Sequence, residues 1–287
     1  MRSMPAPPLL RPEPAGTRWA ADTRAAFAML RAGASAALAE RAALLGRAVF
    51  YLLVMVVLST FWDVVASDHV AGSLVTKLPA QGLMLYVGVT EWITLSVPAV
   101  HLRLEDDFRR GGIESRLLLP PSPLLMRIAE AAGSMLVRMA VLGATALAAY
   151  SLTAHPGITP AAWAAVLTLG LLGGLIGLLL HTLVGLTSVW LRNCVPVFLV
   201  MQKASFLFGG LVAPVTLYPG WLEAVSVASP FGAHLYWPAA LAIAEPQALA
   251  GMAALALSAQ AVWLVLLSSA IALLWRRGLR RMLREGV

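Results

Sequence analysis

The chain has 287 residues, of which 60% are hydrophobic and 12% are charged, and its formal net charge is +7. Soluble domains carry about 25% charged residues, so this composition excludes an ordinary soluble domain. The net positive charge does not indicate binding to nucleic acid, because Lys and Arg flank the apolar stretches, where they attract anionic lipid headgroups and fix orientation. Cys194 is the one cysteine, which excludes an internal disulfide and a cysteine-built metal site.

The N-terminal region divides into two parts. Residues 1–17 are rich in proline and lack the apolar core of a cleavable signal peptide, so we expect a disordered terminus. Residues 18–46 are predicted to form an amphipathic connector helix lying on the membrane. Its apolar positions recur at helical spacing, and its arginines point elsewhere: Phe27, Leu30, Ala34, Leu38 and Leu45 against Arg24, Arg31 and Arg41. The alternative is a loosely ordered basic tail.

Six apolar stretches follow within residues 47–275, near 48–66, 79–101, 131–152, 161–191, 195–217 and 248–275. Each is long enough to cross about 30 Å of hydrocarbon, which takes about 20 residues. Backbone polar groups must pair internally in lipid, and the alternating pattern of a membrane barrel is missing, so helices are expected. The predicted fold is therefore an all-α integral membrane protein with six transmembrane helices and a basic tail at 276–287.

Lys and Arg are divided unequally between the two sides of this topology. Segments 1–47, 102–130, 192–194 and 276–287 hold 18 of them, whereas the opposite side holds Lys77 alone. By the positive-inside rule, both ends of the chain are predicted to be cytoplasmic, in a bacterial inner membrane.

The predicted cytoplasmic loop between the second and third spans carries charges of both signs and then a proline-rich stop. The charged residues are Glu105, Asp106, Asp107, Arg109, Arg110, Glu114 and Arg116. The pattern indicates a short surface helix followed by a rigid turn, which could dock a partner. The alternative is a solvated connector.

A few polar residues fall inside the predicted spans, where they are costly and mark either a path or a buried pair. They are Glu91, Arg138, His181, Gln202 and Lys203. One interpretation is a polar lining of a translocation path. The other is a static ion pair of Glu91 with Arg138 or Lys203 that locks helices together.

The sequence gives no sign of catalysis. Neither Lys77 nor Lys203 lies in a phosphate-cradling Gly-x-x-x-x-Gly-Lys loop, so we expect no ATP hydrolysis by that route. Ser and Asp are not grouped as an intramembrane hydrolase would require, so no enzyme is expected. The five histidines have no metal-ligand spacing, and no metal is expected. Span four carries glycines at small-xxx-small spacing, such as Gly170 and Gly174, which permit close helix packing.

The segment between spans five and six is too apolar for an ordinary loop, and each of its pieces is too short to span. Pro219, Gly220 and Trp221 open it, and Pro230 interrupts it. We expect two short re-entrant helices dipping into the outer leaflet, with Trp221, Tyr236 and Trp237 at the interface.

The order of these features resembles the membrane subunit of ATP-binding-cassette (ABC) exporters of the type-two permease class. That class has a connector helix, six spans, a coupling helix between spans two and three, and re-entrant outer helices between spans five and six. The closest local matches are the loop from Gly111 to Pro120, the Phe208-Gly209-Gly210 stretch, and the hairpin from Tyr218-Pro219-Gly220-Trp221 to Ser229-Pro230-Phe231.

The resemblance implies partners and a mechanism. The chain would pair with a second permease, identical or related, and with a cytoplasmic ABC ATPase dimer that holds the ATP and magnesium, leaving no cofactor in this chain. The loop near Glu105 to Arg116 would couple to the ATPases. Because the spans hold few aromatics, a small hydrophobic or amphiphilic substrate is expected. The alternatives are an ion-coupled secondary transporter with Glu91 as its coupling site and a non-transporting membrane scaffold.

Overall fold

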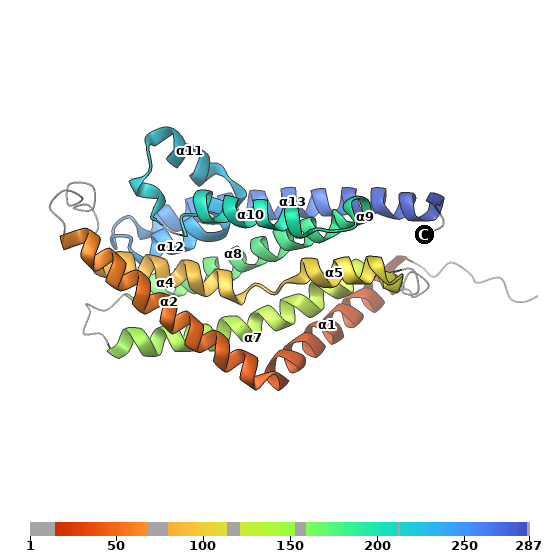
Figure 1. The fold of residues 1–287 in the computed structure, drawn as a ribbon, viewed down its shortest axis with the longest axis horizontal. Helices are drawn as coiled ribbons and strands as arrows, with labels where there is room; N and C mark the ends of the chain where they lie inside the picture. Colours follow the sequence, from red (N-terminus) through yellow and green to blue (C-terminus); the bar gives the residue numbers. More distant parts are fainter. Residues whose placement is uncertain (1–14, 68–79, 114–120, 153–158, 212, 286–287) are drawn as a thin grey trace, which may run out of the picture.

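The computed structural model describes residues 15–67, 80–113, 121–152, 159–211 and 213–285, and this part of the chain is helical with no strand. Its long helices run roughly along one axis (Figure 1). The start of α1 (Ala15–Ala39) and the ends of α5 (Val100–Arg109) and α13 (Leu249–Glu285) lie at one end, called here the basic end. The predicted disorder of residues 1–17 falls almost wholly outside the described residues.

Five helical segments of the described chain are long and apolar enough to cross a membrane: 41–58, 82–109, 123–151, 160–191 and 249–284. They lie on α2 (Arg41–Ser67), on α4 (Ala80–Ser96) with α5, on α7 (Pro123–Leu152), on α8 (Pro160–Leu186) and on α13. The stretch predicted as span five forms the shorter α10 (Val195–Phe208), whose 14 residues extend only about 21 Å. Since α8 ends at the basic end and α13 begins at the opposite end, α10 and the residues after it return the chain between them (Figure 1).

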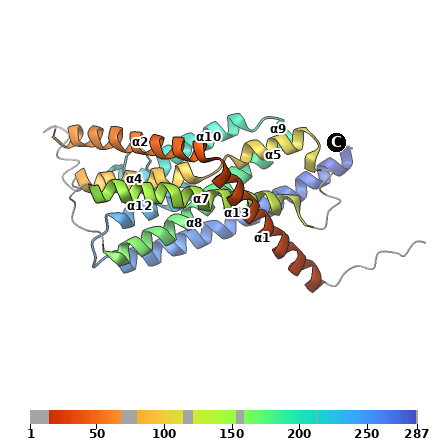
Figure 2. The ribbon, with the colours of Figure 1, turned by 90° about the horizontal axis from the view of Figure 1, so that it is seen from below.

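The N-terminal helix is shorter than predicted and packs differently. It ends at Ala39, and Glu40 separates it from α2, so the predicted boundary near residue 46 is wrong. α1 crosses the half of α7 nearest the basic end (Figure 2). The crossing is close, because a side chain at Gly33 would collide with the Glu130 backbone and one at Gly133 with the Leu30 backbone.

The face of α1 that contacts α7 is built from small residues. Gly33 and Ala37 are buried there, whereas Phe27 and Leu38 of the predicted apolar face are 61% and 56% exposed. Large apolar side chains on the other side of α1 suit a lipid environment, and small ones allow close approach of two helices. The small residues of α1 therefore bind it to the bundle, while Phe27 and Leu38 lie on the exposed side together with Arg24 and Arg31.

The second predicted span breaks where it reaches Pro98. Proline lacks an N–H and disfavours helical geometry in the residue before it, so α4 stops at Ser96 and α5 begins at Val100. The Pro98 carbonyl then accepts a hydrogen bond from His181 Nδ1 on α8, at 3.2 Å. The break redirects the chain and places α5 against α8 and α7.

The segment after α10 folds back into the bundle. α11 (Gly220–Ala228) projects at the end opposite the basic end (Figure 1), while the π-helical turn η2 (Gly232–Tyr236) and α12 (Trp237–Ala242) pack against α8 and α4. Trp221 is 71% exposed, as an interfacial residue would be. Tyr236 is only 8% exposed, so its predicted interfacial position is wrong.

The C-terminal basic segment is not a separate tail. α13 continues without interruption from Leu249 to Glu285 and carries five arginines in its last three turns. The predicted division at residue 275 therefore marks a change of composition within one helix.

Candidate functional site

The charged segment at the basic end is partly folded into the bundle. Arg127 on the first turn of α7 donates to both oxygens of Asp107 on α5, at 2.5 and 2.7 Å, and to Glu130 at 2.8 Å. Arg103 donates to the other oxygen of Glu130 at 2.8 Å. Because the side chains of Asp107, Arg127 and Glu130 are less than one-fifth exposed, this network joins α5 to α7 and is poorly placed to bind a partner.

Glu105 points inward as well. Its carboxylate accepts the Cys194 backbone N–H at 2.8 Å, which ties α5 to the turn between α9 (Ser188–Leu191) and α10. Arg192 in this turn adopts a left-handed φ of 58°, so the turn is tight. Burial, and after it the neighbouring Glu105 carboxylate, raise the pKa of the Cys194 thiol to about 11. The thiol is therefore protonated and unreactive at neutral pH.

The outward face of α5 keeps three of the predicted coupling residues. Asp106 and Arg110 form an exposed ion pair at 2.7 Å, and Arg109 reaches back to Glu105 at 3.5 Å with most of its side chain exposed. The predicted Glu114 and Arg116 lie outside the described residues. The acidic cluster expected on the surface is thus reduced to Asp106 among the described acids, since Glu105 and Asp107 face the bundle.

The three predicted intramembrane charges do not form the expected pair. Glu91 is half-buried on α4, Arg138 is buried on α7, and Lys203 is exposed on α10, with Nζ 5.4 Å from the centroid of the Phe206 ring. Among the ion pairs of the described residues, none joins Glu91 to Arg138 or Lys203. A locking ion pair therefore does not explain these residues.

The predicted His181 and Gln202 line the same cavity, which measures about 250 Å³ and lies beside the break between α4 and α5. Its polar lining comes from six elements: Arg47, Thr94, His101, His181, Gln202, Ser205 and His234. Three of the five histidines therefore gather in one cavity, which their positions 101, 181 and 234 in the sequence do not reveal. The signal that could have found them is polarity inside apolar stretches.

Hydrogen bonds fix the tautomer of two of these histidines. His181 Nδ1 lies 3.2 Å from the Pro98 carbonyl oxygen, and His234 Nδ1 lies 2.8 Å from that of Gly173. A carbonyl oxygen only accepts, so Nδ1 carries the proton in both rings and Nε2 is left as an acceptor. His101 is 2% exposed, and its Nδ1 has no partner.

The rest of the cavity is aromatic and closely packed. Phe198 stacks on His101, with ring centroids 4.0 Å apart, and meets His181 edge-on. Gly177 on α8 makes room for the His234 ring, because a side chain there would overlap the imidazole. The glycines of α8 therefore face helices of this same chain, since Gly170 likewise lies against Trp92.

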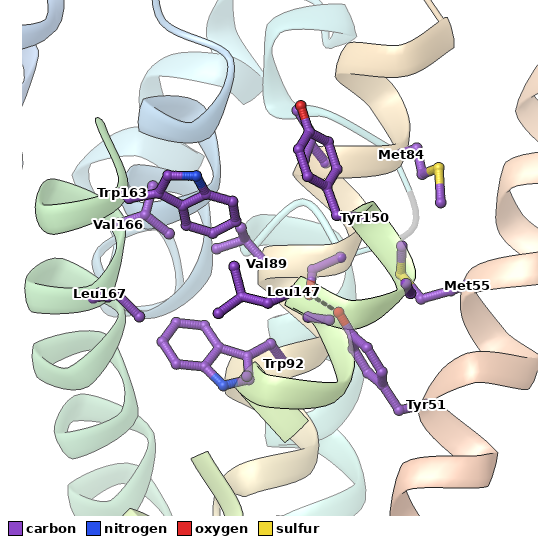
Figure 3. Close-up of a pocket in the computed structure, with 15 residues that line it drawn as sticks. Tyr51, Met55, Met84, Val89, Trp92, Leu147, Tyr150, Trp163, Val166 and Leu167 are labelled. Atoms are coloured by element: carbon purple, nitrogen blue, oxygen red, sulfur yellow. Dashed lines mark hydrogen bonds between the residues drawn. The ribbon is translucent and has the colours of Figure 1, made fainter. Parts of the chain in front are cut away.

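A second hollow lies further along α2 and α4 and is almost entirely apolar (Figure 3). It measures about 60 Å³, space for only a few water molecules, and Trp92, Tyr150 and Trp163 border it. Tyr51 closes one side by donating to the Gly88 carbonyl at 3.0 Å. Arg47 of the polar cavity lies one helical turn before Tyr51, so the two hollows share the walls formed by α2 and α4.

The predicted outer hairpin residues lie at turns. Pro219 caps α11, Gly220 begins it with open space around it, and Pro230 precedes the π-helical turn. Gln260 of α13 anchors this turn by donating to the carbonyls of Ala233 and Leu169 at 3.0 and 2.8 Å. The hairpin is thus built onto the core, and Trp221 and Val225 are its large exposed apolar side chains.

Comparison with known proteins finds a matching family. A family model described as ABC-2 family transporter protein matches residues 82–286, which is more than half of the chain and includes both α5 and most of the polar cavity. No curated protein matches the chain, and no solved structure matches it.

Proposed function

Because the chain belongs to the ABC-2 family of transporter proteins, and is thus a membrane permease of an ABC transporter that works with an ATP-binding subunit, we propose that it is the exporting subunit. In this proposal it moves a small hydrophobic or amphiphilic substrate outward, using ATP hydrolysed by its partner. The chain itself is not an enzyme and holds no cofactor. Its basic end faces the cytoplasm of a bacterial cell, as the distribution of Lys and Arg favours.

One observation supports this proposal above the others: α5 is attached rigidly on its inner side and presents charges on its outer side. Asp107 binds Arg127 of α7, and Glu105 binds the turn before α10. Asp106, Arg109 and Arg110 remain exposed for a partner. A displacement of α5 by a partner bound to its exposed face would therefore be transmitted directly to α7 and α10.

A second permease completes the proposed transporter. The first and last spans are the least buried of the five, with 11% and 17% of their most apolar windows buried inside the chain. Their exposed apolar side chains require lipid or another apolar helix surface. The connector helix α1 packs on α7 beside α5, where it would also feel an ATPase bound at the basic end.

The test is capture of a candidate ABC ATPase partner by this permease. The chain is co-expressed with it and purified through a tag on the permease. The triple variant Asp106→Asn, Arg109→Gln, Arg110→Gln should insert and fold but retain less ATPase, because steering and rim contacts depend on charge. The control, Arg276→Gln with Arg277→Gln on exposed positions of α13, should retain it. Equal capture by both variants would remove α5 from the contact.

The ion-coupled alternative rests on Glu91, an intramembrane carboxyl with no ion pair among the described residues. If Glu91 were the coupling site, Glu91→Gln would abolish transport, and transport would require an ion gradient. We expect instead that transport in vesicles requires ATP and the partner subunit, and that it survives when ion gradients are collapsed.

A further inference from the structure

We propose that the polar cavity binds the anionic head group of an amphiphilic substrate, because its lining combines a positive charge with hydrogen-bonding side chains. This inference rests on the proposed export function and names the substrate class. The polar cavity lies entirely within one chain, between α2, the break at Pro98, α8, α10 and η2. A ligand there would contact α5 itself, through His101, and α8, against which α5 packs.

The charge of the cavity is positive. Arg47 is its one formally charged lining residue, and no carboxylate lines it. Arg47 is half-buried and takes part in none of the ion pairs found among the described residues. Buried Arg138, which does not line the cavity, lies within electrostatic reach of Arg47, Arg103 and Glu40. A half-buried cation is costly without a counter-charge, and a ligand anion would supply one.

The uncharged groups suit an anion that also carries a hydroxyl. Gln202 and Ser205 can donate hydrogen bonds, as can His101, whose Nδ1 lacks a partner. In the neutral rings of His181 and His234 the proton lies on Nδ1, so their Nε2 atoms accept hydrogen bonds. A monoprotonated phosphate monoester offers both acceptors and one O–H donor. A cationic head group would meet Arg47 directly and be repelled.

The size of the cavity fits a head group and not a whole molecule. Drug-sized ligands occupy pockets of about 300–1,000 Å³, whereas this one measures about 250 Å³. Apolar side chains, among them Leu95, Met201 and Phe206, make up the rest of the wall. An acyl or alkyl chain attached to the head group would therefore leave the cavity along apolar surface.

The experiment measures binding of radiolabelled dodecyl phosphate to the purified full chain in nanodiscs of zwitterionic lipid, without the ATPase. Arg47→Gln should weaken binding by about 10- to 100-fold, the loss typical of one hydrogen bond to a charged group. Arg47→Lys keeps the charge but not the planar fork, so it should fall between the two. Arg41→Gln removes an exposed arginine earlier on α2 and should leave binding unchanged. Melting temperatures verify that each variant is folded.

Two further probes test whether binding needs both the apolar chain and the anionic head group. Inorganic phosphate should bind at least tenfold more weakly than dodecyl phosphate, because it lacks the apolar chain. Dodecylphosphocholine has the same chain with a zwitterionic head and should also bind more weakly. Equal binding of either probe, equal loss in Arg47→Gln and Arg41→Gln, or no binding to the parent chain would overturn the proposal. An ATPase that still binds the permease in that event would leave the export function standing.

Discussion

The tie between Glu105 and the Cys194 amide can be tested with the protein's own single cysteine. The Glu105 side chain is 11% exposed, and Cys194 is fully buried, so water cannot replace the carboxylate if it is removed. A hydrogen bond to a charged group contributes about 1.5–3 kcal/mol. Glu105→Ala should therefore raise the population in which the α9–α10 turn is open by about 10- to 150-fold.

Cys194 reports this opening directly. Its thiol reacts only when the turn opens, because it is buried and its pKa is raised to about 11. Alkylation by a maleimide, followed by mass spectrometry, should therefore be slow in the parent chain and faster in Glu105→Ala by at least this factor. Removing the carboxylate also lowers the thiol pKa, which acts in the same direction. Glu105→Gln keeps one acceptor oxygen and should give a smaller rise.

The control for this measurement is the next residue on the same helix. Asp106→Asn removes a carboxylate whose side chain is 54% exposed and which does not contact the turn, so labelling should remain at the parent rate. If Cys194 in Glu105→Ala is labelled as slowly as in the parent chain, the turn is held by packing alone. The connection drawn here between α5 and α10 would then be wrong.

Three other predictions follow from the same structure. Asp107→Ala removes charged hydrogen bonds from Arg127, which keeps Glu130, and should cost about 1.5–3 kcal/mol, seen as a lower melting temperature in detergent. Gly33→Leu should destabilise the chain by about 1–3 kcal/mol through overpacking against α7, whereas Gly46→Leu, with nothing within 4 Å, should not. A cysteine replacing Gln247 should react with an impermeant thiol reagent added to intact cells and one replacing Arg284 should not; the reverse would overturn the orientation.

The sequence predicts helices well here because span length and charge bias are local properties. It fails at the junction of α1 and α2, since apolar periodicity continues through Glu40 and shows no boundary there. It also favours Phe27 and Leu38 as the important face of α1, although Gly33 makes the contact with α7. A glycine contributes almost nothing to a hydrophobic pattern, so only the position of the neighbouring helix reveals its role.

The candidate sites depend on pairings that cross the chain. Glu105 meets a backbone amide 89 residues away, and Asp107 meets Arg127 across a segment of 20 residues. From sequence, both acids look like members of one exposed cluster with Asp106. Their helical positions differ by one residue each, which turns them about 100° apart around α5. Which of these directions faces the bundle is decided by α7 and α8, and no local pattern specifies that.

The same helix links the proposed ATPase contact to the polar cavity. On α5, exposed Asp106 is adjacent to Glu105, and His101, one turn earlier, lines the cavity. Glu105 holds the Cys194 N–H, while the Cys194 carbonyl accepts from the N–H of Phe198 at 2.9 Å, in the first turn of α10. Phe198 in turn stacks on His101. These contacts lead from α5 to α10 and back to α5. A displacement of α5 must therefore move His101 and Phe198 in the cavity wall or break the Glu105 hydrogen bond. By thermodynamic reciprocity, a ligand that fixes those walls must also bias the position of α5. The cavity and the proposed ATPase contact are therefore expected to move together.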